Sequence, residues 1–215
     1  GLVADQILST TGITRGYCLL LDCNDGQLAY ELARRSELII VGVDTDPDQI
    51  ARARALLRKA GVYGSRITLH HAASLESLPY PQSFANLIVA DGGADSVLLP
   101  ATAQQLIPLL QPATGVACLG PWRSVTPTEV KDRVTKWLGE LKANWNFVPA
   151  DEGGWVRITR NPPADTGSWT HQYGDAGNSA NSQEGLQGAA RTDRLEVQWL
   201  GRPGADFGID RNPRM

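Results

Sequence analysis

The sequence places a short polar turn directly after an apolar run. Residues 18–21 are Cys-Leu-Leu-Leu, and the turn that follows reads Asp22-Cys-Asn-Asp-Gly26. Between a strand and a helix, such a turn aims backbone N–H groups and the positive end of the helix at a ligand, and small residues let the backbone approach it closely. Eighteen residues beyond Gly26, Asp44 ends a second apolar run, where a carboxylate can accept hydrogen bonds from both hydroxyls of a ribose. The pair predicts a nucleotide-like ligand, although Asp44 could instead cap a local turn.

Other polar side chains at the ends of apolar runs are weaker candidates. Asp91 follows one such run and could contact a ligand or cap the turn at Gly92-Gly93. His70 and His71 alternate on another run, so one could face the site and one a helix. A structural role is the simpler interpretation, because no partner carboxylate or metal-ligand spacing accompanies them. For His171 we expect a packing or turn role. The sequence identifies no catalytic base and predicts no metal site.

Apolar runs alternate with segments of helical periodicity along the first part of the chain. Short runs of consecutive apolar residues are typical of strands in a parallel sheet that is covered on both faces. Pro47 after Asp46, and the capping box Thr126-Pro-Thr-Glu129, mark two helix starts. We expect strands at 18–21, 38–43, 67–71, 87–90, 115–119, 146–148 and 155–159, and helices at 5–11, 28–35, 47–60, 97–110 and 126–141.

This alternation predicts an α/β fold with a doubly wound, mostly parallel sheet. The last two strands, joined by a turn with Gly153-Gly154, are expected to close it as an antiparallel hairpin. In such sheets ligands bind at the carboxyl ends of the strands. The turn at 22–26, Asp44 and Asp91 are all expected at that edge.

Composition argues against several classes of partner. The chain has 215 residues, of which 42% are hydrophobic and 20% charged, with a formal net charge of −3 and a pI near 5.6. This balance does not favour nucleic-acid binding. The longest apolar run is far shorter than the ~20 residues of a membrane-spanning helix. The three cysteines, Cys18, Cys23 and Cys118, form neither a paired framework nor a zinc motif.

Apolar residues are concentrated in the first part of the chain. Residues 16–92 contain 21 Val, Ile or Leu side chains, whereas residues 161–215 contain only 5. We therefore expect one domain at 1–160 and an irregular C-terminal tail at 161–215, which begins with a linker-like Asn-Pro-Pro-Ala-Asp-Thr-Gly segment. The start at Gly1 and the polar, Gly/Pro-rich end are typical of a piece of a longer protein, from which a secretion signal could have been removed.

Four segments resemble the motifs of class I S-adenosylmethionine-dependent methyltransferases. The first, 16–33, reads Gly-Tyr-Cys-Leu-Leu-Leu-Asp-Cys-Asn-Asp-Gly-Gln-Leu-Ala-Tyr-Glu-Leu-Ala, and the others are 41–54, 78–91 and 109–119. The resemblance covers about residues 3–160 and implies a Rossmann-like, seven-stranded sheet that binds S-adenosylmethionine. It implies the methionine part of the cofactor at Asp22, Cys23, Asn24 and Gly26, the ribose at Asp44 beside Thr45, the adenine near Ser74, and a cofactor or substrate contact at Asp91.

The resemblance also carries differences. When the chain is aligned through Gly26, the family's Gly-x-Gly-x-Gly positions fall on Asp22, Asn24 and Gly26, so two of the three glycines are replaced. The Asp22 side chain would occupy space used by the methionine end, and its charge would repel the cofactor carboxylate and attract the ammonium. Asn24 is less disruptive because Asn tolerates a positive φ.

A second resemblance covers the whole chain. The body and the segments 165–181 and 195–204 are similar to the N-terminal part of bacterial proteins that fuse this fold to a pyrroloquinoline-quinone-type β-propeller. This implies that 161–215 is a linker and the start of a propeller, which would be the partner of the body within one chain or as a separate chain. Pyrroloquinoline quinone itself is not expected in this fragment. Those proteins often carry secretion signals, which implies an extracytoplasmic location, whereas an active methyltransferase implies the cytoplasm.

Three functions remain open at this point. The first is transfer of a methyl group from S-adenosylmethionine to an unknown acceptor. The second is a degenerate, non-catalytic methyltransferase fold that serves as a structural or partner-binding module for an attached β-propeller. The third is a nicotinamide-binding Rossmann domain, because an acidic residue at the end of the second strand is common to both folds. The third is the weakest, since the closing hairpin and the segment Leu78-Pro-Tyr80 fit the methyltransferase order better.

Overall fold

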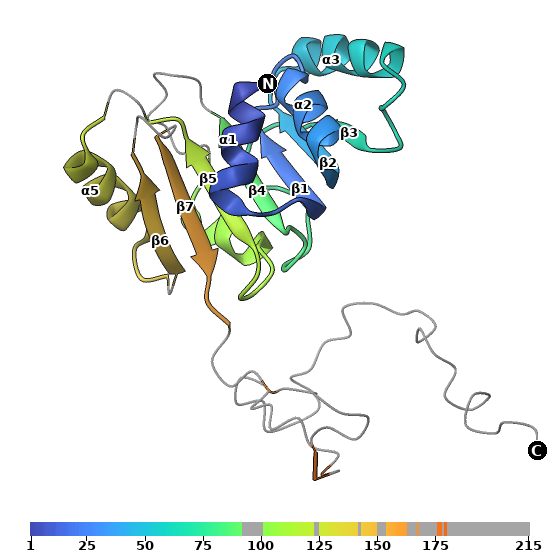
Figure 1. Ribbon diagram of the computed structural model, residues 1–215. Helices are drawn as coiled ribbons and strands as arrows, with labels where there is room; N and C mark the ends of the chain where they lie inside the picture. The colour runs from blue at the N-terminus through green and yellow to red at the C-terminus, as the bar shows by residue number, and fades with distance from the viewer. Residues whose placement is uncertain are drawn as a thin grey trace, which may run out of the picture. The chain divides into compact units, whose positions relative to one another are not determined.

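The computed structural model describes residues 1–91, 101–122, 125–141, 143–149 and 154–162, together with residues 167, 176, 177 and 179. Contacts within the chain divide it into two units, Gly1–Pro162 and Pro163–Met215. All helices and strands discussed below belong to the first unit (Figure 1). Most of the tail at 161–215, His171 included, lies outside the described residues, and so does the expected propeller start.

Strands and helices alternate through most of the first unit. None of the helices in the described ranges is long and apolar enough to cross a membrane. The elements are α1 (Leu2–Thr11), β1 (Arg15–Leu21), α2 (Gln27–Arg35), β2 (Glu37–Asp44), α3 (Pro47–Lys59), β3 (Ile67–His71), β4 (Leu87–Asp91), α4 (Ala103–Leu106), the 3-10 helix η1 (Ile107–Leu109), β5 (Val116–Gly120), α5 (Pro127–Leu138), β6 (Ala143–Val148) and β7 (Trp155–Arg160).

The strands of the described chain form one seven-stranded sheet in the order β3-β2-β1-β4-β5-β7-β6. The pairs β1–β2, β2–β3, β1–β4 and β4–β5 are parallel. The strand β7 runs antiparallel to both β5 and β6. The prediction of a doubly wound, mostly parallel sheet with an antiparallel closing pair is therefore confirmed. Because the strand order reverses between β1 and β4, a ligand crevice is expected at the carboxyl ends of these two strands.

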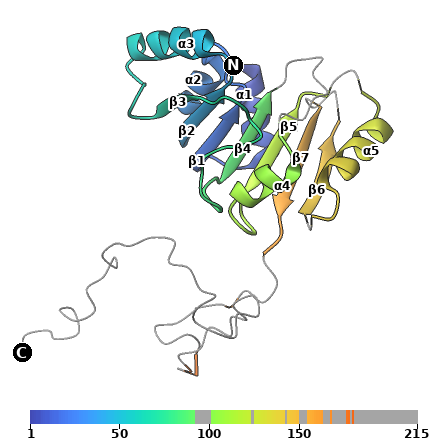
Figure 2. The same ribbon diagram turned by 180° about the vertical axis from the view of Figure 1, so that it is seen from behind.

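Helices cover both faces of the sheet (Figure 1, Figure 2). The helices α1, α2 and α3 lie on one face, and α4 and α5 lie on the other. Alternate residues of β1 serve the two layers, with Cys18 and Leu20 packing under α1–α3 and Leu19 and Leu21 packing towards α4 and α5. All four are at most 1% exposed. Burial on both faces explains why the central strands read as unbroken apolar runs rather than as alternating ones.

Two helix starts predicted from capping residues are confirmed. The Asp46 carboxylate accepts the backbone N–H groups of Asp48 (2.8 Å) and Gln49 (3.1 Å) at the start of α3, and Pro47 occupies the first helical position. Thr126 and Glu129 form the reciprocal capping box of α5. Since the cap residue Asp46 lies two residues after Asp44, the cap also fixes the backbone at the end of β2.

Several element bounds differ from the predicted ones. The helix α1 begins at Leu2 rather than at residue 5, and β6 begins at Ala143 rather than at residue 146. The helix α5 ends at Leu138 because Gly139 leaves the helical conformation with a φ of 57°, although Leu141 still packs on the core. The helix expected at 97–110 is represented by α4 and η1, while residues 97–100 lie outside the described residues.

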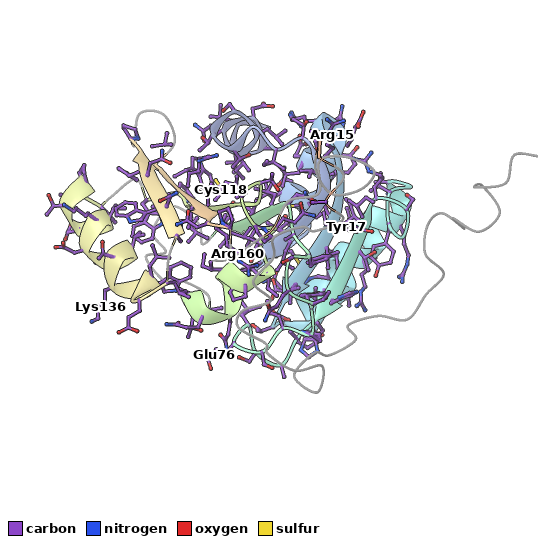
Figure 3. All side chains as sticks on the ribbon, turned by 90° about the horizontal axis from the view of Figure 1, so that it is seen from below. Arg15, Tyr17, Glu76, Cys118, Lys136 and Arg160 are labelled. Carbon is purple, nitrogen blue, oxygen red and sulfur yellow. The ribbon has the colours of Figure 1, made fainter. Side chains whose placement is uncertain are left out.

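The connection between β3 and β4, residues 72–86, contains no helix. Consequently a loop covers the β1–β2–β3 part of the sheet on the side of α4. Tyr17, labelled on β1 in Figure 3, and Ile39 on β2 remain 44% and 42% exposed on this face. Aromatic contacts join the strand β1 to this loop. The ring centroids of Tyr17 and Phe84 lie 5.3 Å apart, and those of Phe84 and Tyr80 also lie 5.3 Å apart.

Candidate functional site

The turn after β1 has a left-handed backbone at alternate residues. The angle φ is 51° at Asp22, 46° at Asn24 and 78° at Gly26. These are the three positions expected for the glycine register, and Asp and Asn adopt this conformation more readily than other residues with a side chain. The N–H of Gly26 donates to the carbonyl O of Cys23 (2.9 Å), and α2 begins at the next residue. The turn therefore places the N-terminus of α2 at the edge of the sheet.

Asp44 ties this turn to the end of β2. It is only 5% exposed, and its Oδ2 accepts the backbone N–H of Asn24 (2.8 Å) while its Oδ1 accepts the backbone N–H of Asp46 (2.9 Å). The turn-capping role that the sequence left open for Asp44 is thus observed. Each carboxylate oxygen can accept more than one hydrogen bond, so this bonding leaves capacity for a ligand hydroxyl.

A cavity of about 280 Å³ opens beside the turn, and we call it the loop cavity. Its walls come from α1, the turn itself, α2 and the end of β4. Among the described residues that line it are four carboxylates, Asp22, Asp25, Glu31 and Asp91. Glu31 is paired with Arg35 and with the N-terminal ammonium of Gly1, which also lines the cavity. The carboxylates of the turn, Asp22 and Asp25, favour a cationic group beside them.

Burial controls the protonation of two residues of the turn. Burial raises the pKa of the Asp22 carboxyl, and the negative charge of Asp44 raises it further. Burial also raises the pKa of the Cys23 thiol to about 12, with a smaller contribution from Asp44. The Cys23 thiol therefore stays protonated near neutral pH and is a poor nucleophile, since the thiolate is the reactive form.

Two glycines near the turn lie so close to neighbouring side chains that an added Cβ would displace them. A Cβ on Gly26 would lie 3.3 Å from the Cβ of Ala53 and 3.2 Å from Leu57 Cδ1, so this glycine lets the turn pack against α3. A Cβ on Gly42 would lie 3.0 Å from the Cβ of Cys23 and 2.5 Å from Leu69 Cδ2. Gly42 was not singled out from the sequence, because the close approach of Cys23 to β2 appears only in three dimensions.

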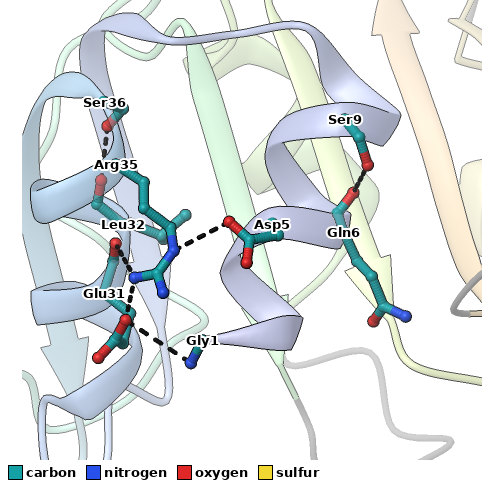
Figure 4. Close-up of polar contacts among 8 residues, drawn as sticks. All are labelled: Gly1, Asp5, Gln6, Ser9, Glu31, Leu32, Arg35 and Ser36. Atoms are coloured by element: carbon teal, nitrogen blue, oxygen red, sulfur yellow. Dashed lines mark hydrogen bonds and ion pairs between the residues drawn. The ribbon is translucent and has the colours of Figure 1, made fainter.

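Polar contacts hold α1 against α2 and so set one wall of the loop cavity (Figure 4). Arg35 Nε pairs with Asp5 Oδ1 at 2.9 Å, and the same guanidinium pairs with Glu31 one turn earlier on α2. Glu31 itself lines the loop cavity. The arginine therefore links the cavity wall on α2 to the helix that faces it.

A second cavity, of about 370 Å³, lies at the carboxyl ends of β2 and β3, and we call it the strand-end cavity. It has apolar walls from Val43, Pro79 and the ring of Tyr80. Polar groups are supplied by two serines, Ser74 and Ser77, and by His70 and His71. The Oγ of Ser74 accepts the backbone N–H of Glu76 (3.0 Å), which leaves its own O–H free to donate to a ligand.

Asp44 connects the two cavities. It follows Val43 in the chain and is the register partner of His71, and both of these residues line the strand-end cavity. On the other side it holds Asn24, which lines the loop cavity. A buried carboxylate therefore lies between a cavity with acidic walls and a cavity with an aromatic wall.

The structure brings most of the predicted site residues together. Asp22, Cys23, Asn24 and Asp91 line the loop cavity, and Ser74 lines the strand-end cavity. Asp44 lines neither cavity, but it bonds to Asn24 in the wall of the first and is the register partner of His71 in the wall of the second. Gly26 belongs to the turn but faces α3, and Thr45 is exposed and lines neither cavity. The turn at Gly92-Gly93, which Asp91 could cap, lies outside the described residues.

Three residues of the strand-end cavity depart from expectation. His70 and His71 were expected to face opposite sides, yet both line this cavity, because β3 ends at His71 and the chain turns there. Tyr80 received no site role from the sequence. The feature of the sequence that could have indicated a role for it is the segment Leu78-Pro-Tyr80, in which an aromatic residue lies shortly before the fourth strand.

Comparisons with known proteins agree with this architecture. A family model described as a methyltransferase domain matches residues 19–112. No curated protein matches the chain. Among solved structures, a candidate S-adenosyl-L-methionine-dependent methyltransferase from Methanococcus maripaludis superposes with a TM-score of 0.61 at 18% identity, over 75% of this chain and 85% of that one.

Two further structures share the fold at lower identity. A methyltransferase from Aquifex aeolicus that depends on S-adenosylmethionine gives a TM-score of 0.53 at 13% identity, over 72% of this chain and 86% of that one. The YcgJ protein from Bacillus subtilis gives 0.53 at 12% identity, over 75% and 99%. Together with the strand order, these likenesses show that residues 1–162 have the fold of class I S-adenosylmethionine-dependent methyltransferases.

Proposed function

We propose that this chain binds S-adenosylmethionine along the carboxyl edge of its sheet and transfers the methyl group to an acceptor. The observation that carries the proposal is the position of Asp44, a buried carboxylate between two cavities of different chemistry. In this arrangement the methionine part occupies the loop cavity, Asp44 accepts from the ribose hydroxyls, and the adenine enters the strand-end cavity.

The residues of the loop cavity fit the cationic end of this cofactor. Its acidic walls match an ammonium and a sulfonium, and Asp22 is the carboxylate held in the turn beside them. The cofactor carboxylate requires donors instead. The N-terminus of α2 supplies them in part. The Asp25 carboxylate accepts the N–H of Gln27 (3.0 Å), so the donors are the next N–H groups, those of Leu28 and Ala29, which lack acceptors within the helix.

The strand-end cavity fits a flat heterocycle. The Tyr80 ring offers an aromatic face, Val43 an apolar wall, and Ser74 a hydroxyl that can donate to a ring nitrogen. Ser74 stands where an acidic residue is frequent in the resembled family, so recognition here depends on a neutral hydroxyl.

When bound, S-adenosylmethionine supplies a methyl group on a positively charged sulfur, which a nucleophile can displace directly. The chain's contribution is alignment of the two partners, which can by itself account for a large part of such a rate enhancement. Asp91, at the end of β4 in the wall of the loop cavity, is the carboxylate we assign to contact with the cofactor or the acceptor. The acceptor itself is not identified by these residues.

A non-catalytic role is the second candidate, and two observations favour it. Both oxygens of Asp44 are already bonded to backbone N–H groups, and Asp22 lines the loop cavity at a position where the resembled family has glycine. In that case the fold would serve as a structural or partner-binding module for the β-propeller expected from residue 161 onward.

Calorimetric titration of the full chain with S-adenosylmethionine, S-adenosylhomocysteine and NAD separates these functions. We expect saturable binding of the first two and none of NAD. Asp44→Asn keeps one oxygen for the turn but removes the charge, and should weaken binding about tenfold. The matched control is Asp48→Asn, which removes the same charge from an exposed residue that lines neither cavity.

Failure to bind would also be informative. If a folded chain gives no heat with either adenosyl ligand, the methyltransferase proposal is wrong. If binding then appears in the double variant Asp22→Gly, Asn24→Gly, the chain carries a decayed cofactor site, as the non-catalytic candidate requires.

A further inference from the structure

His70 and Tyr80 form a pair in the wall of the strand-end cavity. The Nδ1 of His70 lies 2.8 Å from the hydroxyl O of Tyr80, and the two rings stack with centroids 6.1 Å apart and an interplanar angle of 18°. On its other side Tyr80 stacks on Phe84, with centroids 5.3 Å apart at 14°. The Tyr80 ring is therefore oriented by one hydrogen bond and two ring neighbours.

The direction of the hydrogen bond follows from the chemistry of its two groups. Burial raises the pKa of Tyr80 to about 12, so its hydroxyl keeps its proton near neutral pH. A neutral imidazole can then accept that O–H at Nδ1 and carry its own proton on Nε2. This hydrogen bond selects one tautomer of His70.

The pair lies among groups of mixed chemistry. His71 and the hydroxyls of Ser74 and Ser77 line the same cavity. The buried carboxylate of Asp44 is the register partner of His71, whereas the register neighbour of His70 on β2 is the apolar Val43. Within the cavity wall, the ring nitrogen of His70 is therefore the acceptor that orients the Tyr80 hydroxyl.

We propose that His70 is a positioning residue, which acts through Tyr80 to hold an aromatic wall for a heterocyclic ligand in the strand-end cavity. The ligand class rests on the proposed function, in which this cavity takes the adenine ring. Loss of the hydrogen bond between His70 and Tyr80 should therefore weaken ligand binding.

The pair itself can be tested without any ligand. In the full chain, the imidazole nitrogen NMR shifts of His70 should report mainly the Nε2–H tautomer. In Tyr80→Phe, which keeps the ring but removes the hydroxyl, we expect a mixture of both tautomers. A mixture already present in the wild type would overturn the positioning role.

The consequence for binding is tested with 5′-methylthioadenosine, a probe that lacks the ammonium and carboxylate and is therefore insensitive to Asp22. In His70→Ala, which removes the acceptor of the Tyr80 O–H, the dissociation constant of the probe should rise about fivefold. His70→Asn, which keeps an acceptor oxygen near the position of Nδ1, should retain the wild-type affinity. His71→Ala is the matched control and should also retain it.

Unchanged binding in His70→Ala, or an equal loss in His71→Ala, would overturn the assignment to His70. Tyr80→Phe should bind about fivefold more weakly than the wild type. No binding by the wild type would contradict the proposed function, and the tautomer measurement would still decide whether His70 orients Tyr80.

Discussion

Replacement of Asp44 by Ala should destabilise the fold measurably, because it removes the acceptor of two backbone N–H groups. These belong to Asn24 and Asp46, at 2.8 Å and 2.9 Å from the carboxylate oxygens. Hydrogen bonds to a charged group contribute about 1.5–3 kcal/mol each. Asn24 is exposed and water can replace part of its bond, so we expect a total loss of about 3 kcal/mol in the free energy of unfolding.

That loss can be read from urea unfolding and from thermal melting of the full chain. For a protein of this size about 1 kcal/mol corresponds to roughly 3 °C, so the midpoint should fall by roughly 9 °C. Asp44→Asn retains one acceptor oxygen and should lose about half as much. Asp48→Ala, the matched control at the exposed start of α3, should cost no more than about 0.5 kcal/mol. A loss below about 1 kcal/mol in Asp44→Ala would refute the view that this carboxylate holds the turn.

Two further variants test the packing and charge of the turn. Asp22→Asn should raise the free energy of unfolding at neutral pH. Burial and the charge of Asp44 raise the pKa of Asp22, so the ionised side chain destabilises the folded state above that pKa. The gain in the variant should vanish in acid, where Asp22 is protonated in both the folded and the unfolded state, and urea unfolding at several pH values measures it. If the gain is as large in acid as at neutral pH, charge burial is not its cause. Gly42→Ala should lower the free energy of unfolding by about 2 kcal/mol, because the added Cβ would meet Leu69 and Cys23. Adding Leu69→Val to this variant should recover part of the loss. If the losses of the two single variants simply add in the double variant, the contact with Leu69 is not responsible.

The fold could be predicted largely from local sequence signals. The apolar runs at 18–21 and 38–43 lie within β1 and β2, because strands buried on both faces tolerate few polar residues. Pro47 and the Thr126–Glu129 box marked helix starts through capping chemistry, which depends only on neighbouring residues. The short α4 was harder to predict, since a helical pattern does not distinguish four α-helical residues from the 3-10 turn that follows.

The candidate site was predicted only where it follows strand ends. Asp22, Asp44 and Asp91 could be placed at one edge because parallel strands bring their carboxyl ends together. The roles of Tyr80 and Gly42 could not be predicted. Tyr80 acts through its contact with His70 and Gly42 through its contact with Cys23, and no sequence pattern indicates either contact. The bonding of both Asp44 oxygens to backbone N–H groups likewise follows from the fold and has no sequence pattern.

The most direct test of the central claim is an NMR titration of the isotope-labelled full chain with S-adenosylhomocysteine. If the cofactor lies along the carboxyl edge of the sheet, the largest amide shifts should fall in the turn at 22–26, at residues 44–46 and in the wall of the strand-end cavity from Ala72 to Tyr80. The Asn24 amide, which donates to Asp44, should be among those most affected. Shifts confined to other surfaces, or no shifts at saturating ligand, would contradict the proposed cofactor site.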